Sequence, residues 1–164
     1  MPEIFLISDT HFGHSKVLEY EESRRMLGRN VEEHDEALVQ RWNAVVRKND
    51  TVWHLGDVLF GAHSFPTLGR LNGNKKLVMG NHDTYNVARY LEYLKDIKGV
   101  AQLDKCILSH IPLDIGQKYR YQANIHGHMH SRRMPDPWYR NVSCEQIDFQ
   151  PIPFYIIRNE LRSK

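Results

Sequence analysis

The chain has 164 residues, a hydrophobic fraction of 41%, a charged fraction of 26% and a formal net charge of +2. These values are typical of one soluble globular domain spanning residues 1–164, and the near-neutral charge does not mark a nucleic-acid binder. No apolar run reaches the length of a membrane span, and the segment Met1-Pro2-Glu3-Ile4 lacks the features of a signal peptide. Cys106 and Cys144 have no CxxC pairing, so we expect reduced thiols in a cytoplasmic protein.

An apolar run over residues 3–8 predicts a first strand that is buried on both faces. It is followed by Asp9-Thr10-His11-Phe12-Gly13-His14, where a carboxylate and an imidazole two residues apart point the same way in an extended chain. A short helix is expected over residues 17–20. A longer helix begins after Asn30, a good N-cap with Glu33 three residues later, and we expect it to end near Asn49.

The next two strands, residues 51–55 and 76–79, also end in polar residues. Gly56-Asp57 follows the first of them, and Gly80-Asn81-His82-Asp83 follows the second. Between them we expect a loop and a short helix. We expect Asp83 or Thr84 to cap a further helix over about residues 87–94.

The remaining chain predicts strands over residues 99–103 and 105–109, joined by a turn at Asp104, and the second strand ends at His110. Residues 123–126 form another expected strand, which ends in Gly127-His128-Met129-His130. Residues 138–144 and 154–157 are expected to be late strands of a second sheet. The chain is therefore expected to have an α/β fold.

Five polar clusters thus follow apolar runs, and ligands gather past the carboxyl ends of strands in α/β sheets. Their side chains comprise carboxylates, an amide and several imidazoles without thiolates, a set that suits manganese, iron or zinc and is too large for one tetrahedral site. Two cations ~3.5–4 Å apart activate a bridging water and neutralise the oxygens of an in-line displacement. The residues therefore favour hydrolysis of phosphate esters.

The blocks resemble the five motif blocks of the calcineurin-like metallophosphoesterase superfamily, in the family's order over residues 9–130. The resemblance is greatest to small bacterial and phage phosphoesterases. It implies a four-layer α/β/β/α sandwich of two mixed sheets, with a dimetal site at the carboxyl ends of the strands. The implied cofactors are two divalent metal ions, with manganese preferred and iron, zinc or nickel as alternatives.

The resemblance also implies roles for individual residues. One metal would be held by Asp9, His11 and His130. The other would be held by Asn81, His110 and His128, and Asp57 would bridge the two. His82 would act beside the leaving group, as a general acid or as a donor to the phosphoryl oxygens.

One block departs from the Gly-Asp-x-x-Asp-Arg-Gly pattern of the family's protein phosphatases. It reads Gly56-Asp57-Val58-Leu59-Phe60-Gly61, without the second Asp and the Arg, which argues against a phosphoprotein substrate. His14, Arg120 and Arg132 are candidate substrate contacts, although each also fits an ordinary solvated loop.

We expect a phosphodiesterase acting on small or nucleotide-type esters. The alternatives are a nuclease for short single strands, which the charge does not favour, and a non-catalytic metal-binding scaffold of the kind a retromer subunit represents. The intact His82 and the seven candidate ligands favour an enzyme. No oligomeric state is indicated.

Overall fold

Two mixed β-sheets form the centre of the structure, which is a computed structural model that describes residues 1–163. In the five-stranded sheet the order is β4-β3-β2-β1-β9, with bounds β1 (Ile4–Ile7), β2 (Thr51–His54), β3 (Asn74–Val78), β4 (Asp96–Lys98) and β9 (Ile152–Pro153). Its strands β1 to β4 are parallel, and β9 is antiparallel to β1. The second sheet has the order β5-β6-β7-β8, with bounds β5 (Ala101–Leu103), β6 (Cys106–Leu108), β7 (Ala123–His126) and β8 (Tyr139–Asn141).

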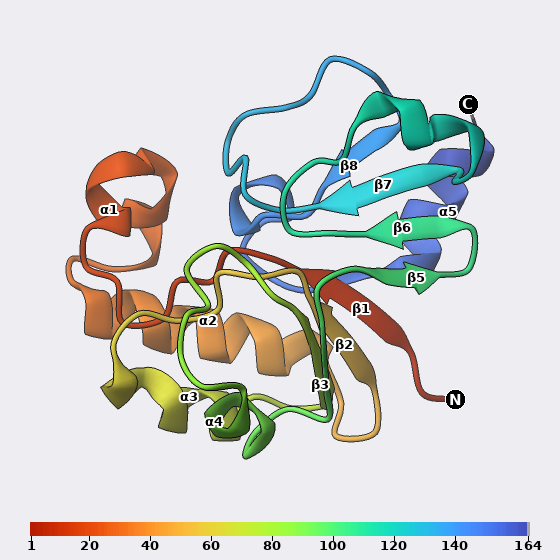
Figure 1. The fold of residues 1–164 in the computed structure, drawn as a ribbon. Coiled ribbons are helices and arrows are strands. Elements are labelled where there is room, and N and C mark those ends of the chain that lie inside the picture. Colours follow the sequence, from red (N-terminus) through yellow and green to blue (C-terminus); the bar gives the residue numbers. More distant parts are fainter. Residues whose placement is uncertain (164) are drawn as a thin grey trace.

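Helices flank the sheets, which confirms the prediction of an α/β fold with two mixed sheets. The α-helices are α1 (Val17–Tyr20), α2 (Val31–Val45), α3 (Phe65–Arg70), α4 (Val87–Leu91) and α5 (Phe154–Arg162). The 3-10 helices are η1 (Glu22–Leu27), η2 (Ala62–Ser64), η3 (Ile115–Tyr119) and η4 (Cys144–Gln146). In Figure 1, α2 and α3 lie on one side of strands β1 to β3, and strands β5 to β8 lie on the other. Within residues 1–163, no helix combines the length and apolar character needed to cross a bilayer.

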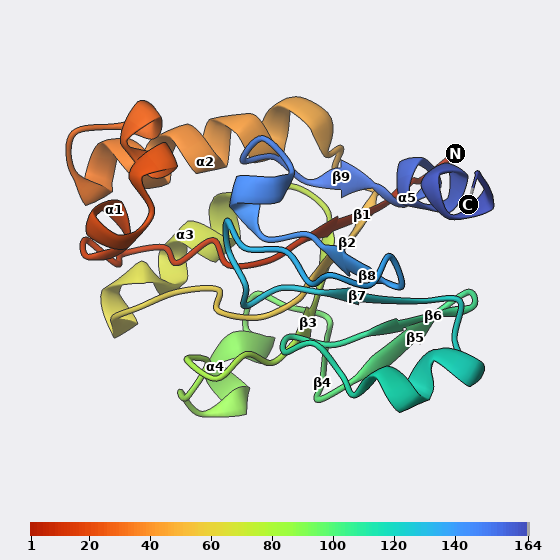
Figure 2. The ribbon, with the colours of Figure 1, turned by 90° about the horizontal axis from the view of Figure 1, so that it is seen from above.

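The carboxyl ends of strands from both sheets face the same side of the molecule. Strands β6, β7 and β8 are mutually parallel, and β1, β2 and β3 are parallel to one another. Figures 1 and 2 show that the loops leaving β1 and β7 lie on the side of the molecule where α1 is found. The loops that carry the polar clusters are therefore gathered at one edge.

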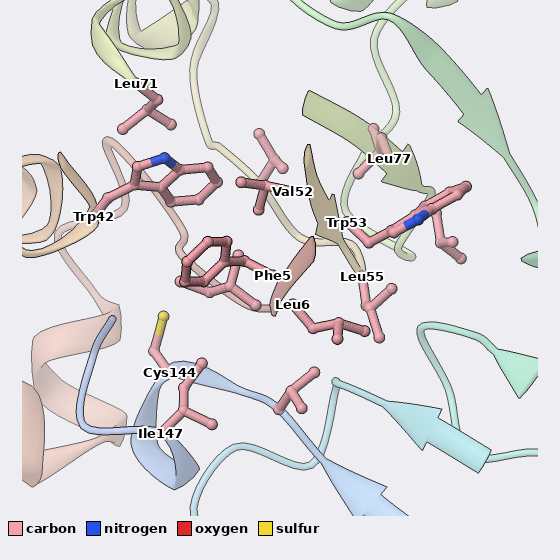
Figure 3. Close-up of a cluster of buried hydrophobic side chains, with 14 of the residues drawn as sticks. Phe5, Leu6, Trp42, Val52, Trp53, Leu55, Leu71, Leu77, Cys144 and Ile147 are labelled. Atoms are coloured by element: carbon pink, nitrogen blue, oxygen red, sulfur yellow. The ribbon is translucent and has the colours of Figure 1, made fainter. Parts of the chain in front are cut away.

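One buried cluster of apolar side chains includes residues from both sheets. In Figure 3, Trp42 of α2 lies beside Phe5 of β1 and Val52 of β2, and all three side chains are almost fully buried. Trp42 also donates its indole N–H to the backbone carbonyl of Asn72 at 3.0 Å, which satisfies its polar atom inside the core. This packing fixes α2 against the five-stranded sheet, whose strand ends carry Asp9, Asp57 and Asn81.

Helix α2 begins as predicted but ends earlier than Asn49. The Asn30 side chain accepts a hydrogen bond from the backbone N–H of Glu33 at 2.8 Å, and this confirms the N-cap. The helix ends at Val45, because Val46 is already extended (φ −94°, ψ 127°). Asp50 then accepts hydrogen bonds from the backbone of Glu3 and Arg47, which directs the chain into β2.

Two sequence predictions near the C-terminal end of the chain are corrected. Residues 154–157 do not form a strand but begin helix α5, in which Phe154 and Ile157 share the buried face. The strand expected over residues 138–144 is reduced to β8, because Ser143 and Cys144 leave the ladder and turn into η4. Cys106 and Cys144 are both buried and unpaired.

Candidate metal centre

Backbone hydrogen bonds hold the polar loops edge to edge. The Asp9 N–H donates to the Gly56 carbonyl at 3.0 Å, and the His11 N–H donates to the Asp57 carbonyl at 3.1 Å. In the second sheet, the Gly127 N–H donates to the His110 carbonyl at 3.0 Å. The loops after β1 and β2, and those after β6 and β7, are thus paired at residues that carry ligand-type side chains.

Two groups that consist only of predicted ligands could each hold a cation, and a third group joins His130 to Glu21 and Glu145. The ligand-type atoms of each group lie within 4.8 Å of one another, and the groups are Asp9, His11 and His130 in one case and Asp57, His110 and His128 in the other. Six of the seven predicted ligands therefore lie together in these two groups, each offering a carboxylate oxygen or an imidazole nitrogen. The seventh, Asn81, lies beside the second group, with its Oδ1 atom 2.9 Å from Nε2 of His110.

Asp57 belongs to the second group, but its carboxylate also lies near the first. Its Oδ2 atom is 3.7 Å from Nε2 of His11, which belongs to the first group, and 3.4 Å from Nε2 of His110, which belongs to the second. Its Oδ1 atom accepts a hydrogen bond from the backbone N–H of His82 at 3.0 Å. One oxygen is thereby fixed to the chain, while the other faces both groups.

The ligand positions have unusual backbone conformations. Eight described non-glycine residues have a positive φ, and five of them are predicted ligands, namely Asp9, His11, Asp57, His128 and His130, with φ between 48° and 65°. Residues other than glycine rarely adopt this left-handed backbone conformation. Those that do cluster at functional sites, where the surrounding structure imposes the geometry. The loops are thus held in conformations that aim these side chains at a common point.

Several polar atoms at this point fit a bound cation. Asp9 Oδ1 and His11 Nε2 are buried and have no hydrogen-bond partner within residues 1–163, and they lie 3.7 Å apart. Burial alone would raise the pKa of Asp9, but the imidazoles of His11, His110 and His130 hold it below its usual value. Burial lowers the pKa of His11, which keeps its ring neutral and a lone pair available. An ionised carboxylate and a neutral imidazole are the forms that bind metals.

His110 is oriented by a carbonyl group behind it. Its Nδ1 atom donates to the Leu55 carbonyl at 2.7 Å, so Nε2 faces Asp57 and Asn81. Burial disfavours the charged ring, but the hydrogen bond with Asp57 and the charge of Asp9 raise the pKa of His110 to about 9. The raised pKa favours a proton on Nε2, the atom that faces Asp57 and Asn81.

Asp83 is not a helix cap, which corrects the sequence prediction; Asn86 caps α4 instead, by accepting from the backbone N–H of Ala88. The buried Asp83 carboxylate accepts three backbone hydrogen bonds, from Asp57 at 2.8 Å, Val58 at 3.0 Å and Gly80 at 2.8 Å. It therefore joins the loop after β2 to the loop after β3. A Cβ atom on Gly80 would collide with Asp57, so this close approach requires glycine.

Sequence reasoning missed two residues behind the site, Arg24 and Glu145. The fully buried Arg24 guanidinium donates to the carbonyls of Asp9 and Thr10 and to Glu145 Oε1, the last at 2.6 Å. The same Glu145 oxygen lies 3.1 Å from Nδ1 of His130, so Nε2 of that ring faces Asp9. An Arg in an irregular charged segment carries no signal that would have identified it as a buried residue.

His54 and His34 are buried histidines whose contacts are structural. His54 Nδ1 accepts from the backbone N–H of Gly56, so its Nε2–H donates to Thr10 Oγ1 at 2.9 Å. Burial lowers the pKa of His54 to about 3. His34 lies beside Arg24 and Asp35, and the Asp35 carboxylate in turn accepts from the backbone N–H of Gly13.

A cavity opens directly on the two groups. It has a volume of about 480 Å³, and its lining includes His11, Asp57, His82, His128 and His130, together with Lys16, Tyr20, Phe60 and the predicted residues His14 and Arg132. Burial and neighbouring imidazoles lower the pKa of His14 to about 4, so its ring is neutral. His82 is exposed, and its ring centroid is 6.1 Å from that of His11.

Arg120 is the candidate substrate contact that the structure does not bring to this cavity. It follows η3 and lines a separate surface cavity with Tyr119 and Tyr121. The reason is topological. The residue precedes β7 and therefore lies at the amino end of that strand, whereas the site lies at the carboxyl end.

Comparison with known proteins identifies a family for this chain. A calcineurin-like phosphoesterase superfamily domain matches residues 3–142. The uncharacterized protein MJ1445 of Methanocaldococcus jannaschii is 34% identical over 170 residues, covering 96% of this chain and 90% of its own. The gene 66 protein of Mycobacterium phage L5 is 40% identical over 88 residues, which is 51% of this chain and 41% of the phage protein.

Two solved structures have a similar fold. A protein of unknown function from Aquifex aeolicus superposes with a TM-score of 0.77 at 25% identity, covering 97% of this chain and 99% of its own. An archaeal phosphodiesterase superposes with a TM-score of 0.50 at 20% identity, covering 86% of this chain and 82% of its own, which shows likeness of fold.

Proposed function

The chain belongs to the calcineurin-like phosphoesterase superfamily and is a metal-dependent phosphoric ester hydrolase, and from this premise we propose that it is a phosphodiesterase acting on small or nucleotide-type esters. The observation that carries the proposal is the position of Asp57 Oδ2. This atom lies 3.7 Å from Nε2 of His11 in the first group and 3.4 Å from Nε2 of His110 in the second. A carboxylate shared by two neighbouring groups of metal ligands suits the hydrolysis of a phosphate ester by two metal ions.

The residues would divide between two cations. Asp9, His11 and His130 would hold the first, and Asn81, His110 and His128 would hold the second, with Asp57 shared. When bound, the cations would activate a water and neutralise charge on the phosphoryl oxygens. We favour manganese, with iron, zinc or nickel as alternatives, because the donor set combines carboxylate and amide oxygens with imidazoles and lacks thiolates.

His82 would serve the leaving group. Its backbone N–H is tied to Asp57 and its exposed ring lines the cavity, so the imidazole is held at the rim of the site without being a member of either group. There it can donate a proton or a hydrogen bond to the departing oxygen. General acids of this kind contribute about 10²–10⁴-fold to the rate.

The cavity supports a diester of small size. Its volume of about 480 Å³ is within the range of small-molecule sites, about 300–1,000 Å³, and leaves room for ester groups beside the phosphate. Lys16 and Arg132 at the lining supply positive charge toward an anionic substrate. Neither feature requires a long nucleic-acid strand.

The test is the hydrolysis of diphenyl phosphate by manganese-loaded protein, compared with its His82→Ala variant, because the poorly departing phenoxide benefits from a donated proton, unlike p-nitrophenolate. We expect kcat to fall by about 10²–10⁴-fold while elemental analysis finds the same manganese content. The matched control is His63→Ala, an exposed histidine in η2 that does not line the cavity, which should retain the wild-type kcat. Unchanged turnover in His82→Ala would refute the role of His82, and an inactive wild type over mono- and diesters would refute the phosphodiesterase.

A further inference from the structure

Four aromatic rings follow one another along the lining of the cavity. The ring of His82 lies 4.9 Å from that of Phe60, and Phe60 stacks on His14 at 3.9 Å with an interplanar angle of 9°. His14 in turn lies 5.9 Å from Tyr20 of α1. All four side chains line the same cavity.

This series is not explained by core packing. Tyr20 is 63% exposed, and His14 and Phe60 are only partly buried. Phe60 stands in the segment that follows Asp57 after β2, next to Gly61. The chain thus presents aromatic side chains to the cavity beside the proposed leaving-group residue.

We propose that these rings form a subsite for a planar aromatic or heteroaromatic ring carried by the leaving group of the ester, such as an aryl group or a nucleobase. The inference rests on the proposed function, because it takes the phosphate to be held at the two groups and the leaving group to depart beside His82. Because Phe60 and His14 already stack on each other, the substrate ring would lie against the outer surface of this pair, and Tyr20 would extend that surface for a larger ring. Lys16 and Arg132 would attract the anionic ester without selecting its ring.

The test compares two phosphonates that cannot be hydrolysed at their carbon–phosphorus bond. Isothermal titration calorimetry on manganese-loaded protein would measure the Kd of phenylphosphonate and of methylphosphonate. A single aromatic stack corresponds to roughly a tenfold difference in affinity, so we expect phenylphosphonate to bind about tenfold more tightly. Phe60→Leu should abolish this preference and leave the Kd of methylphosphonate unchanged, and Phe60→Tyr should restore it.

A longer probe and a remote control complete the design. Biphenyl-4-phosphonate should lose affinity in Tyr20→Leu, while Tyr119→Leu, which removes an 83% exposed ring outside this cavity, should bind all three probes as the wild type does. Equal Kd values for the phenyl and methyl compounds in the wild type would overturn the subsite and leave the proposed function standing. Failure of either compound to bind the metal-loaded protein would instead contradict the proposed function.

Discussion

The Nε atom of Arg24 donates a hydrogen bond to Oε1 of Glu145 at 2.6 Å, and both side chains are buried. Glu145 also accepts a hydrogen bond from Nδ1 of His130. The pair therefore contacts the proposed first metal site through the ring nitrogen of His130 that faces away from it. The same guanidinium holds the carbonyls of Asp9 and Thr10, in the loop where Asp9 and His11 have positive φ. A partner that orients a ligating imidazole and fixes its tautomer strengthens metal binding.

Replacing Glu145 by Gln should therefore weaken one of two cation-binding events. The amide keeps the size of the side chain but removes the charge that orients His130, and such changes cost about 10–100-fold in metal affinity. Calorimetric titration of metal-free protein with Mn²⁺ would measure both events. Glu160→Gln, which removes the partner of Arg140 at the surface, is the control and should bind as the wild type does. Two unchanged binding events in Glu145→Gln would rule out the positioning role.

Asp57 and His130 should differ in how many cations they affect. Since Asp57 Oδ2 faces both groups and His130 belongs to one, Asp57→Asn should weaken both cations, whereas His130→Ala should leave one bound. Elemental analysis after dialysis against excess Mn²⁺ would report about two cations for the wild type, one for His130→Ala and fewer than one for Asp57→Asn. Full occupancy in Asp57→Asn would contradict the shared carboxylate.

The sequence indicated that the candidate ligands would lie close together, because each follows a strand. Parallel strands bring their carboxyl ends to one edge, so Asp9 and Asp57, which follow neighbouring strands β1 and β2, had to lie close together. The N-cap of α2 at Asn30 was likewise a local signal. Those features depend on neighbours in the sequence or on sheet topology alone.

The supporting contacts could not be predicted, because they join distant segments. Arg24 and Glu145 are 121 residues apart in the chain, and nothing in either neighbourhood indicates a buried ion pair. Asp83 is a residue type that often caps helices. In the fold its carboxylate instead accepts hydrogen bonds from two backbone N–H groups of the loop after β2 and from one in its own loop. The positions of these side chains are thus determined by tertiary contacts, which the local sequence does not specify.

Asp50 should make the stability of the metal-free protein depend on acid pH. Burial would raise its pKa, but hydrogen bonds from the backbone of Glu3 and Arg47 lower it below the ordinary value. A carboxyl group with a lowered folded-state pKa stabilises the protein above its unfolded pKa, about 3.9, and this stabilisation is lost as the pH falls through the folded-state pKa.

We therefore expect Asp50→Asn to reduce the free energy of unfolding by about 1–2 kcal/mol at pH 7, since bonds to a charged acceptor are replaced. The difference from the wild type should shrink as the pH is lowered below about 4. Urea titrations of the two metal-free proteins at a series of pH values between 7 and 3 would measure it. A difference that stays constant over that range would show that the charge of Asp50 does not contribute.

Neighbouring isoleucines in α5 provide a test of the element that the sequence misassigned. The run Phe154-Tyr155-Ile156-Ile157 alternates poorly and is rich in strand-forming residues, which favoured a strand. In a strand, Phe154 would share a face with Ile156, whereas in a helix it shares a face with Ile157 and Leu161. Phe154 is 6% exposed, Ile157 0% and Ile156 36%, which is the helical pattern.

Ile157→Ala should accordingly lower the free energy of unfolding by about 2–5 kcal/mol, because it removes buried methyl groups and leaves a cavity in the shared core. Ile156→Ala deletes the same atoms from a partly exposed site and should cost less than about 1 kcal/mol. Urea denaturation monitored by far-UV circular dichroism measures both variants in identical conditions. Because the two substitutions are chemically the same, equal losses of stability, or a larger loss at Ile156, could come only from a different packing of this segment against β1 and β9.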